Sequence, residues 1–232
     1  MTSPNTPDNA RDAVLQAALP HVPFDGWSET TLRAAITDSG VTEGLARALF
    51  PRGGIDLAVA FHQQGDARMR ETLVTTDLTQ MRFRDRIAFA IRTRLDLVED
   101  RELVRRGTTL FALPQHTAEG ARLIWGTADA IWTTLGDTTR DLNWYSKRAT
   151  LSAVYGSTVL YWLGDDTPGH QATWDFLDRR IADVMQIETL KAKLRENPLG
   201  KAILAGPAKV MEKWRVPTVP DDLPGKIMDR FR

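Results

Sequence analysis

The segment 141–148, DLNWYSKR, places an acid, two aromatic rings and a base at helical spacing. Counted from Asp141, the rings of Trp144 and Tyr145 lie at i+3 and i+4, and a base follows at i+7, which is Arg148. Such spacing puts all four side chains on one face of a helix. Exposed Trp, Tyr and Arg side chains are typical of a binding hot spot for a protein partner. The pattern therefore predicts either a docking surface or, if it is buried, a cluster that ties two helices together.

Catalytic chemistry has no comparable support in the sequence. None of the four histidines lies in an H-E-x-x-H motif or in a repeated E-x-x-H motif, and the single pair His116 and Glu119 does not make a di-metal site. We find no P-loop, no nucleophile elbow, no dinucleotide fingerprint and no cysteine. We therefore expect a protein that is not an enzyme and that holds no metal and no cofactor.

The composition is that of an ordinary globular protein. The 232 residues carry a formal net charge of zero, which gives no global attraction to nucleic acid. No apolar run approaches the ~20 residues that cross a bilayer. The first residues show neither a signal peptide nor an Arg-rich transit peptide. We expect a cytoplasmic protein, peripheral on the cytoplasmic face of the inner membrane if the source is bacterial.

Helical periodicity runs through most of the chain. It covers 55–76, 80–97, 99–112 and 117–136, and no alternating stretch favours a strand over a helix. Upstream, Ser28 is a plausible N-cap and Gly40 suits a helix end. The prediction is an all-α fold of roughly nine or ten helices.

Four parts of the chain differ in character. We expect disorder in residues 1–10, a helix-turn-helix-like region in 11–64, a helical bundle in 65–187, and an amphipathic segment with an extended tail in 188–232.

A long apolar helix is predicted after residue 147. One of its stripes is rich in small residues and includes Ala153, Gly156 and Leu160, whereas another includes Tyr155 and Trp162. A helix that is apolar all round lies in the middle of a bundle. The small-residue stripe permits either close helix packing or space for a guest molecule.

The segment 188–215 is basic and amphipathic. It holds seven Lys or Arg and three Glu, a local charge of +4, with helix junctions expected at Asn197-Pro198 and Gly206-Pro207. Each basic residue near an anionic surface contributes ~1 kcal/mol to binding, so the segment is suited to reversible membrane docking. Trp214 is either an interfacial anchor or a packing residue. The expected membrane contacts are Leu199, Ile203, Leu204, Lys209, Val210, Met211, Lys213 and Trp214.

Residues 14–50 resemble the helix-turn-helix of tetracycline-repressor regulators. The matching positions are Phe24, Gly26, Trp27, Thr31, the run SGVTEGL at 39–45 and Phe50. A recognition helix must neutralise phosphates and reach base edges. Arg47 is the only basic residue in 41–50, and residues 1–64 carry four Arg against seven acids. We therefore expect no binding to nucleic acid. A ligand-responsive transcriptional regulator remains the alternative function.

Two longer stretches carry a more specific resemblance. Residues 141–185, which begin DLNWYSKRATLSAVYG, and residues 112–137, ALPQHTAEGARLIWGTADAIWTTLGD, resemble the ubiquinone-biosynthesis accessory proteins encoded by the ninth coenzyme-Q gene. The resemblance extends over about residues 10–187. It implies a tetracycline-repressor-like helical fold, usually dimeric, without enzymatic activity.

The resemblance also implies a set of partners. We expect the chain to bind an isoprenoid quinone or a phospholipid as cargo in an apolar cavity and to dock on an anionic membrane. It would present the lipid to the di-iron demethoxyubiquinone hydroxylase; a lipid-binding partner outside quinone metabolism is the remaining alternative. The family's partner-binding patch falls on Asp141, Trp144, Tyr145, Lys147 and Arg148. The expected lipid contacts are Arg148, Ala153, Gly156, Leu160 and Trp162.

Overall fold

The computed structural model of the chain describes residues 7–137 and 142–196, of which 142–143 and 187–196 by their backbone alone. This part is all-α, as predicted, with ten α-helices, one short 3-10 helix and no strand in the described ranges. The helices are α1 (Pro7–Ala18), α2 (Val22–Asp25), α3 (Glu29–Ser39), α4 (Glu43–Leu49), α5 (Gly54–Thr75), α6 (Phe83–Asp96), α7 (Arg101–Ala112), α8 (Thr117–Thr134), α9 (Leu142–Leu163), the 3-10 helix η1 (Pro168–His170) and α10 (Gln171–Glu196).

The chain divides into two compact units, Met1–Ala182 and Asp183–Arg232. The boundary falls inside α10, which the structure describes as far as Glu196; the expected junction at Asn197-Pro198 lies outside the described residues. All contacts described below lie in the first unit.

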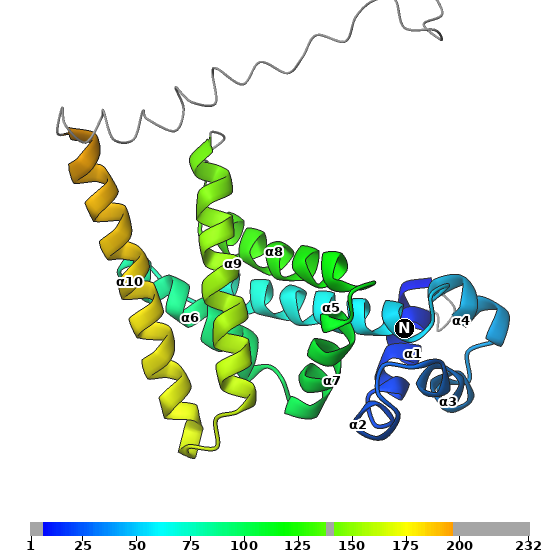
Figure 1. Cartoon of the computed structure of the whole chain (residues 1–232). Helices are drawn as coiled ribbons and strands as arrows, with labels where there is room; N and C mark the ends of the chain where they lie inside the picture. The colour runs from blue at the N-terminus through cyan, green and yellow to red at the C-terminus, as the bar shows by residue number, and fades with distance from the viewer. Residues whose placement is uncertain (1–6, 138–141, 197–232) are drawn as a thin grey trace, which may run out of the picture. The chain divides into compact units, whose positions relative to one another are not determined.

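The helices α1 to α4 form a group at one end of α5 (Figure 1). The N-cap predicted for α3 is present, because the Ser28 hydroxyl accepts a hydrogen bond from the Thr31 amide at 3.2 Å. The helix ends at Gly40, whose φ of 66° lies in the left-handed region that glycine adopts without strain. The two local signals that predicted this helix are therefore both confirmed.

Trp27 joins this group to the rest of the unit. Its side chain is buried, its ring lies 5.3 Å from that of Phe61 on α5, and its Nε1 donates to the Leu103 carbonyl on α7 at 3.0 Å. A Cβ on Gly54 would lie 2.4 Å from the Trp27 backbone, so only glycine allows α5 to begin this close to α3. The N-terminal helices and the bundle thus share one hydrophobic core.

Helix α9 is buried along one stripe and open along another. Tyr155 and Trp162 are buried at 3% and 2% exposure, whereas Leu160 is 62% exposed and Ala153 is also exposed. The expectation that α9 is enclosed on every side is therefore wrong. Small apolar residues do not distinguish a helix face in tight packing from one beside an open space, and part of this face borders a cavity.

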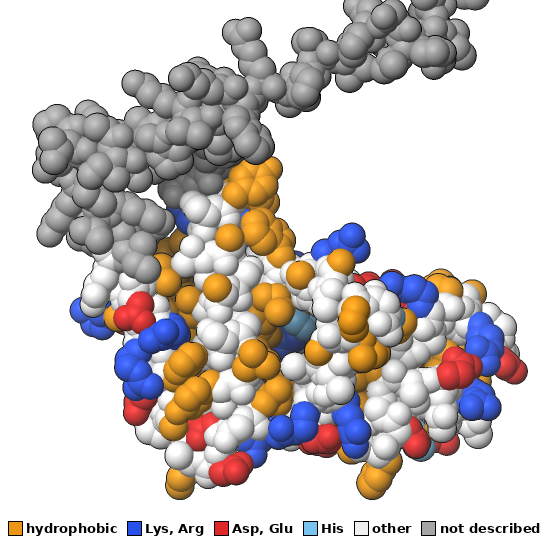
Figure 2. Space-filling model, in the orientation of Figure 1, with side chains coloured by type: hydrophobic (Ala, Val, Ile, Leu, Met, Phe, Trp, Pro, Cys, Tyr) orange, Lys and Arg blue, Asp and Glu red, His pale blue; other side chains and the backbone are white. Residues whose placement is uncertain are grey.

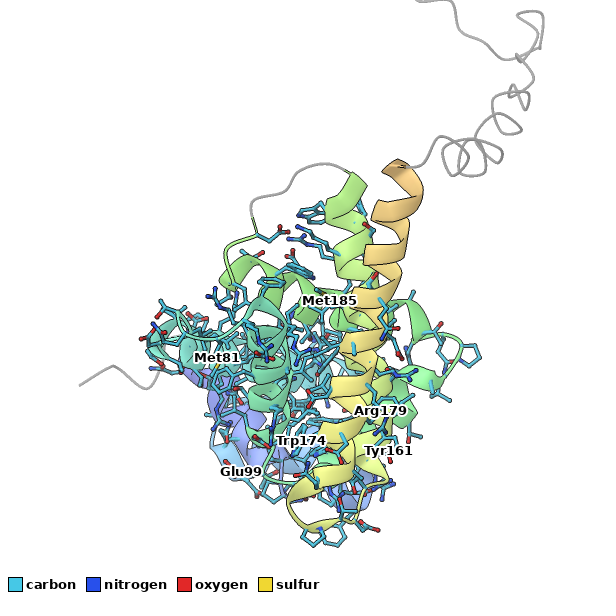
Figure 3. All side chains as sticks on the ribbon, turned by 90° about the vertical axis from the view of Figure 1, so that its left-hand side faces the viewer. Met81, Glu99, Tyr161, Trp174, Arg179 and Met185 are labelled. Atoms are coloured by element: carbon cyan, nitrogen blue, oxygen red, sulfur yellow. The ribbon has the colours of Figure 1, made fainter. Side chains whose placement is uncertain are left out.

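The turn from α9 to α10 is closed by Asp165. Its carboxylate accepts hydrogen bonds from the amides and hydroxyls of Thr167 and Thr173 at 2.6–2.9 Å, which holds its pKa well below the usual range. Figure 3 shows Tyr161 and Trp174 near this turn; the Trp174 Nε1 donates to the Gly169 carbonyl at 2.8 Å. The turn therefore fixes the antiparallel approach of the first part of α10.

Candidate functional site

The first unit contains an apolar cavity of about 430 Å³. Its wall combines side chains from α5, α6, α7, α8 and α9, together with Trp27. Aromatic and aliphatic residues dominate the lining, among them Phe61, Leu95, Phe111 and Ile124. Figure 2 shows a hollow bordered by apolar side chains, with a histidine and a basic side chain visible at its base. This volume lies within the range of about 300–1,000 Å³ that is usual for small-molecule sites.

Two of the five residues expected to contact lipid line this cavity. Gly156 and Leu160 form part of the α9 wall. Ala153 and Trp162 are not among the lining residues; Trp162 packs instead edge-to-face with His170, their ring centroids 5.9 Å apart. Arg148 is also absent from the cavity wall, for reasons given below.

One end of the cavity is polar, which the sequence analysis missed. His62, Arg94 and Tyr155 reach the wall, and Asp66 and Thr127 lie behind them. Arg94 Nε donates to Asp66 at 2.7 Å, and Thr127 Oγ1 lies 3.0 Å from the second Asp66 oxygen. The i, i+4 spacing of His62 and Asp66 on α5 was the available signal, since it places an imidazole and a carboxylate on one face.

Burial sets the protonation of this polar end. It lowers the pKa of His62 to about 4, with the nearby Arg94 acting in the same direction and Asp66 opposing it. Burial also raises the pKa of the Tyr155 phenol. At neutral pH the imidazole and phenol are therefore uncharged, and Arg94 is balanced by the carboxylate of Asp66.

Within the 141–148 segment, the structure exposes Tyr145 and buries Arg148. Tyr145 is 61% exposed and its ring packs edge-to-face on Trp144, with centroids 4.8 Å apart. Lys147 is half-buried and pairs with Asp137 at 2.8 Å. Asp141 lies outside the described residues.

Arg148 corrects the expectation of a four-residue exposed face. Its side chain is 2% exposed, bonded to Asp129 and Asp137, and lies 3.9 Å from the centroid of the Trp144 ring. A buried guanidinium requires such partners because an unpaired buried charge is costly. Arg148 therefore stabilises the segment from inside the fold. Its guanidinium is accessible neither to a protein partner nor to a lipid head group.

The predicted membrane contacts from Leu199 to Trp214 lie outside the described residues. Among the described helices, none has the length and apolarity needed to span a bilayer. In the described ranges no three His, Asp or Glu side chains converge as metal ligands.

The one basic side chain of α4, Arg47, is paired with carboxylates of its own chain. Arg47 pairs with Glu29 and with Glu43, at 2.9 Å in each case. Both carboxylates compete with any phosphate for the guanidinium, and they add negative charge where DNA would approach. The single cation of α4 is therefore engaged by one carboxylate of α3 and one of α4.

Known proteins resemble both the sequence and the fold. Residues 117–188 match the COQ9 family model. The chain is 31% identical over 188 residues to "Ubiquinone biosynthesis protein COQ9, mitochondrial" of Drosophila melanogaster, covering 79% of this chain and 57% of that protein. The rat protein of the same name is 30% identical over 201 residues, covering 83% and 64%. The chain thus spans about three fifths of the length of these relatives.

A solved structure supports the fold. The TetR transcriptional regulator from Nitrosomonas europaea ATCC 19718 superimposes with a TM-score of 0.60 at 19% identity, over 74% of this chain and 95% of that one. This likeness establishes a tetracycline-repressor-type fold, as the helix-turn-helix resemblance implied.

The expected bacterial cytoplasmic location is wrong. The relatives from Drosophila, rat and Dictyostelium discoideum are all named as mitochondrial proteins, which contradicts that expectation. The expectation rested on the first residues of the given sequence, in which neither a signal peptide nor a transit peptide was recognised. Sequence and structure together show that the chain belongs to the COQ9 family of ubiquinone biosynthesis proteins and has a tetracycline-repressor-type fold.

Proposed function

We propose that this protein acts without catalysis in ubiquinone biosynthesis, by binding an isoprenoid quinone intermediate and presenting it to the demethoxyubiquinone hydroxylase. The names of its relatives support a role in that pathway. The observation that carries the proposal is the cavity of about 430 Å³, whose mostly apolar wall suits the hydrocarbon chain of a lipid.

Delivery of such a lipid requires a route to a membrane and to the enzyme. We assign the membrane contact to the basic segment 188–215 and the enzyme contact to the exposed Tyr145 with its neighbour Trp144. Tyr145 is suited to that role because a large exposed ring supplies contact area at small conformational cost. A homodimer, as the resemblance implies, would present two such surfaces.

Blocking the cavity tests the proposal directly. A Cβ on Gly156 would lie 3.7 Å from Ile124, an ordinary contact, so Gly156→Leu inserts its remaining carbons into the cavity with little strain. Gly126→Leu is the matched control, since Gly126 is exposed on α8 and a Cβ there meets nothing within 4 Å. Lipids copurified with each protein are extracted and identified by mass spectrometry. We expect isoprenoid quinones with the parent and the control, and strongly reduced amounts with Gly156→Leu. Recovery of equal lipid from all three would contradict the proposal.

A ligand-responsive transcriptional regulator is the second candidate, because the fold is shared with a TetR regulator. The ion pairs of Arg47 argue against it. Titration of the chain with double-stranded DNA at physiological salt separates the two functions. Sequence-specific binding that a lipid releases would favour the regulator, whereas no binding favours the lipid carrier.

A further inference from the structure

The cavity has two chemically different regions. Most of its wall is hydrocarbon, but the side chains of His62, Arg94 and Tyr155 meet at one place on it. These three come from α5, α6 and α9, so the polar place is assembled by the tertiary fold. Leu160, also part of the wall, is 62% exposed and marks a side that is open to solvent. A ligand inside therefore meets the side chains of His62, Arg94 and Tyr155 at one end and a mostly apolar wall along the rest.

A second layer holds these polar groups in place. Asp66 accepts a hydrogen bond from Arg94 Nε at 2.7 Å, and the Thr127 hydroxyl lies 2.9 Å from His62 Nε2. Arg94 also donates through Nη2 to the His62 carbonyl at 3.1 Å. Side chains fixed in this way lose little freedom when they bind a ligand.

The polar end carries no net charge at neutral pH. Arg94 is offset by Asp66, and the buried His62 and Tyr155 are neutral. A carboxylate or phosphate placed here would lose its hydration without gaining an uncompensated cation, and Asp66 would repel it. A neutral group with oxygen acceptors avoids this cost and can still accept hydrogen bonds.

We infer that the polar end selects the head of a neutral lipid whose ring carries carbonyl, hydroxyl or ether oxygens, with its ring at His62, Arg94 and Tyr155 and its chain directed toward Leu160. This assignment rests on the proposed function, and it adds the orientation and the charge class of the ligand. Anionic lipids, both free fatty acids and phospholipids, are disfavoured at this end.

Three small probes distinguish recognition of the head group from non-specific binding of an apolar chain. Ubiquinone-2 has an oxygenated ring, geranylbenzene has a chain of the same length on a ring without oxygen, and oleate has an anionic head. Affinities are measured on the full chain by displacement of the fluorescent probe N-phenyl-1-naphthylamine. With a net hydrogen bond or two at stake, we expect ubiquinone-2 to bind about five- to tenfold tighter than geranylbenzene and tighter than oleate.

Two variants test the residues. Tyr155→Phe removes one hydroxyl and keeps the ring, and His62→Leu removes the imidazole, with His62→Gln as the conservative variant. Thr158→Val is the control, since it removes a buried α9 hydroxyl that is not part of the cavity wall. We expect Tyr155→Phe and His62→Leu to lose most of the preference for ubiquinone-2 while binding geranylbenzene as before. We expect His62→Gln to recover part of that preference, and Thr158→Val to retain all of it.

The outcomes separate this inference from the function on which it rests. If the parent binds neither ubiquinone-2 nor geranylbenzene, the proposed lipid cavity fails. If it binds both equally, or binds oleate tightest, the cavity stands and head-group selection is overturned. The parent alone decides these points, so they do not depend on the folding of any variant.

Discussion

His62 makes the stability of this protein depend on pH in a way that can be calculated. Burial lowers the pKa of its imidazole from the usual 6.5 to about 4 in the folded chain. Between these two values the unfolded chain binds the proton and the folded chain does not. The contribution of the neutral His62 imidazole to the free energy of unfolding is therefore at its maximum above about pH 6.5, and it decreases as the pH falls toward 4.

The size of the effect follows from the two pKa values. Each pKa unit is worth about 1.4 kcal/mol, so the shift amounts to about 3 kcal/mol at most. Between pH 7 and pH 5 the linkage relation gives a loss of about 2 kcal/mol in the free energy of unfolding. The His62 side chain is 19% exposed, so solvent screening removes only a small part of this.

Urea unfolding of the parent and of His62→Gln at pH 7 and pH 5 measures this loss. Glutamine keeps a polar amide in the same place but does not titrate, so its variant should lose about 2 kcal/mol less than the parent between the two pH values. His21→Gln is the control for the loss of a histidine elsewhere, because His21 lies in the turn between α1 and α2. Equal pH dependence in the parent and His62→Gln would refute the assignment of a neutral, buried imidazole to the cavity wall.

Three further predictions concern stability and are measured by denaturant unfolding. Arg148→Met should cost about 1–3 kcal/mol because Asp129 loses its guanidinium partner while Asp137 keeps Lys147, whereas Tyr145→Ala should stay within about 0.5 kcal/mol; similar losses for both would contradict the buried role of Arg148. Gly54→Ala should cost about 3 kcal/mol or more, since its Cβ would overlap backbone atoms, while Gly44→Ala, with open space around it, should stabilise by about 0.5 kcal/mol; a harmless Gly54→Ala would show that α5 can move away. Ser28→Ala should cost about 1 kcal/mol through loss of the α3 cap, and an unchanged midpoint would show that the cap is dispensable.

The comparison of Tyr145 with Arg148 also bears on partner mapping. Loss of enzyme binding in an Arg148 variant would follow from unfolding of the segment as readily as from a missing contact. Tyr145→Ala changes only an exposed ring, so it is the informative variant for the proposed docking surface. We expect it to weaken binding to the hydroxylase in a pull-down without lowering the unfolding midpoint.

Local signals were sufficient to predict the helices. Ser28 and Gly40 mark the ends of α3 in the sequence, and the 3.6-residue periodicity located α5, α7 and α8 to within a residue or two. These features depend on neighbours along the chain, and such interactions are encoded locally.

Long-range pairing was the part that the sequence did not reveal. Helical spacing put Arg148 on the same face as Trp144, and the two are indeed in contact, but it could not show that Asp129 and Asp137 from another stretch would enclose the guanidinium. His62 and Arg94 likewise belong to different helices, 32 residues apart, and only packing brings them to one wall. Burial decides what such groups do, and burial is a property of the tertiary structure.

The indole of Trp27 belongs to the core of the N-terminal helices and also to the boundary of the hollow beside α7. A ligand in the cavity would contact Trp27, the residue that joins the N-terminal helices to α5 and α7. If the protein binds a ligand there, as proposed, binding would be linked to the stability of α1 to α4, since a ligand that favours an ordered Trp27 also opposes the opening of the helices packed on it. Under the proposed function, α1 to α4 would therefore unfold less readily in the ligand-bound protein than in the empty one.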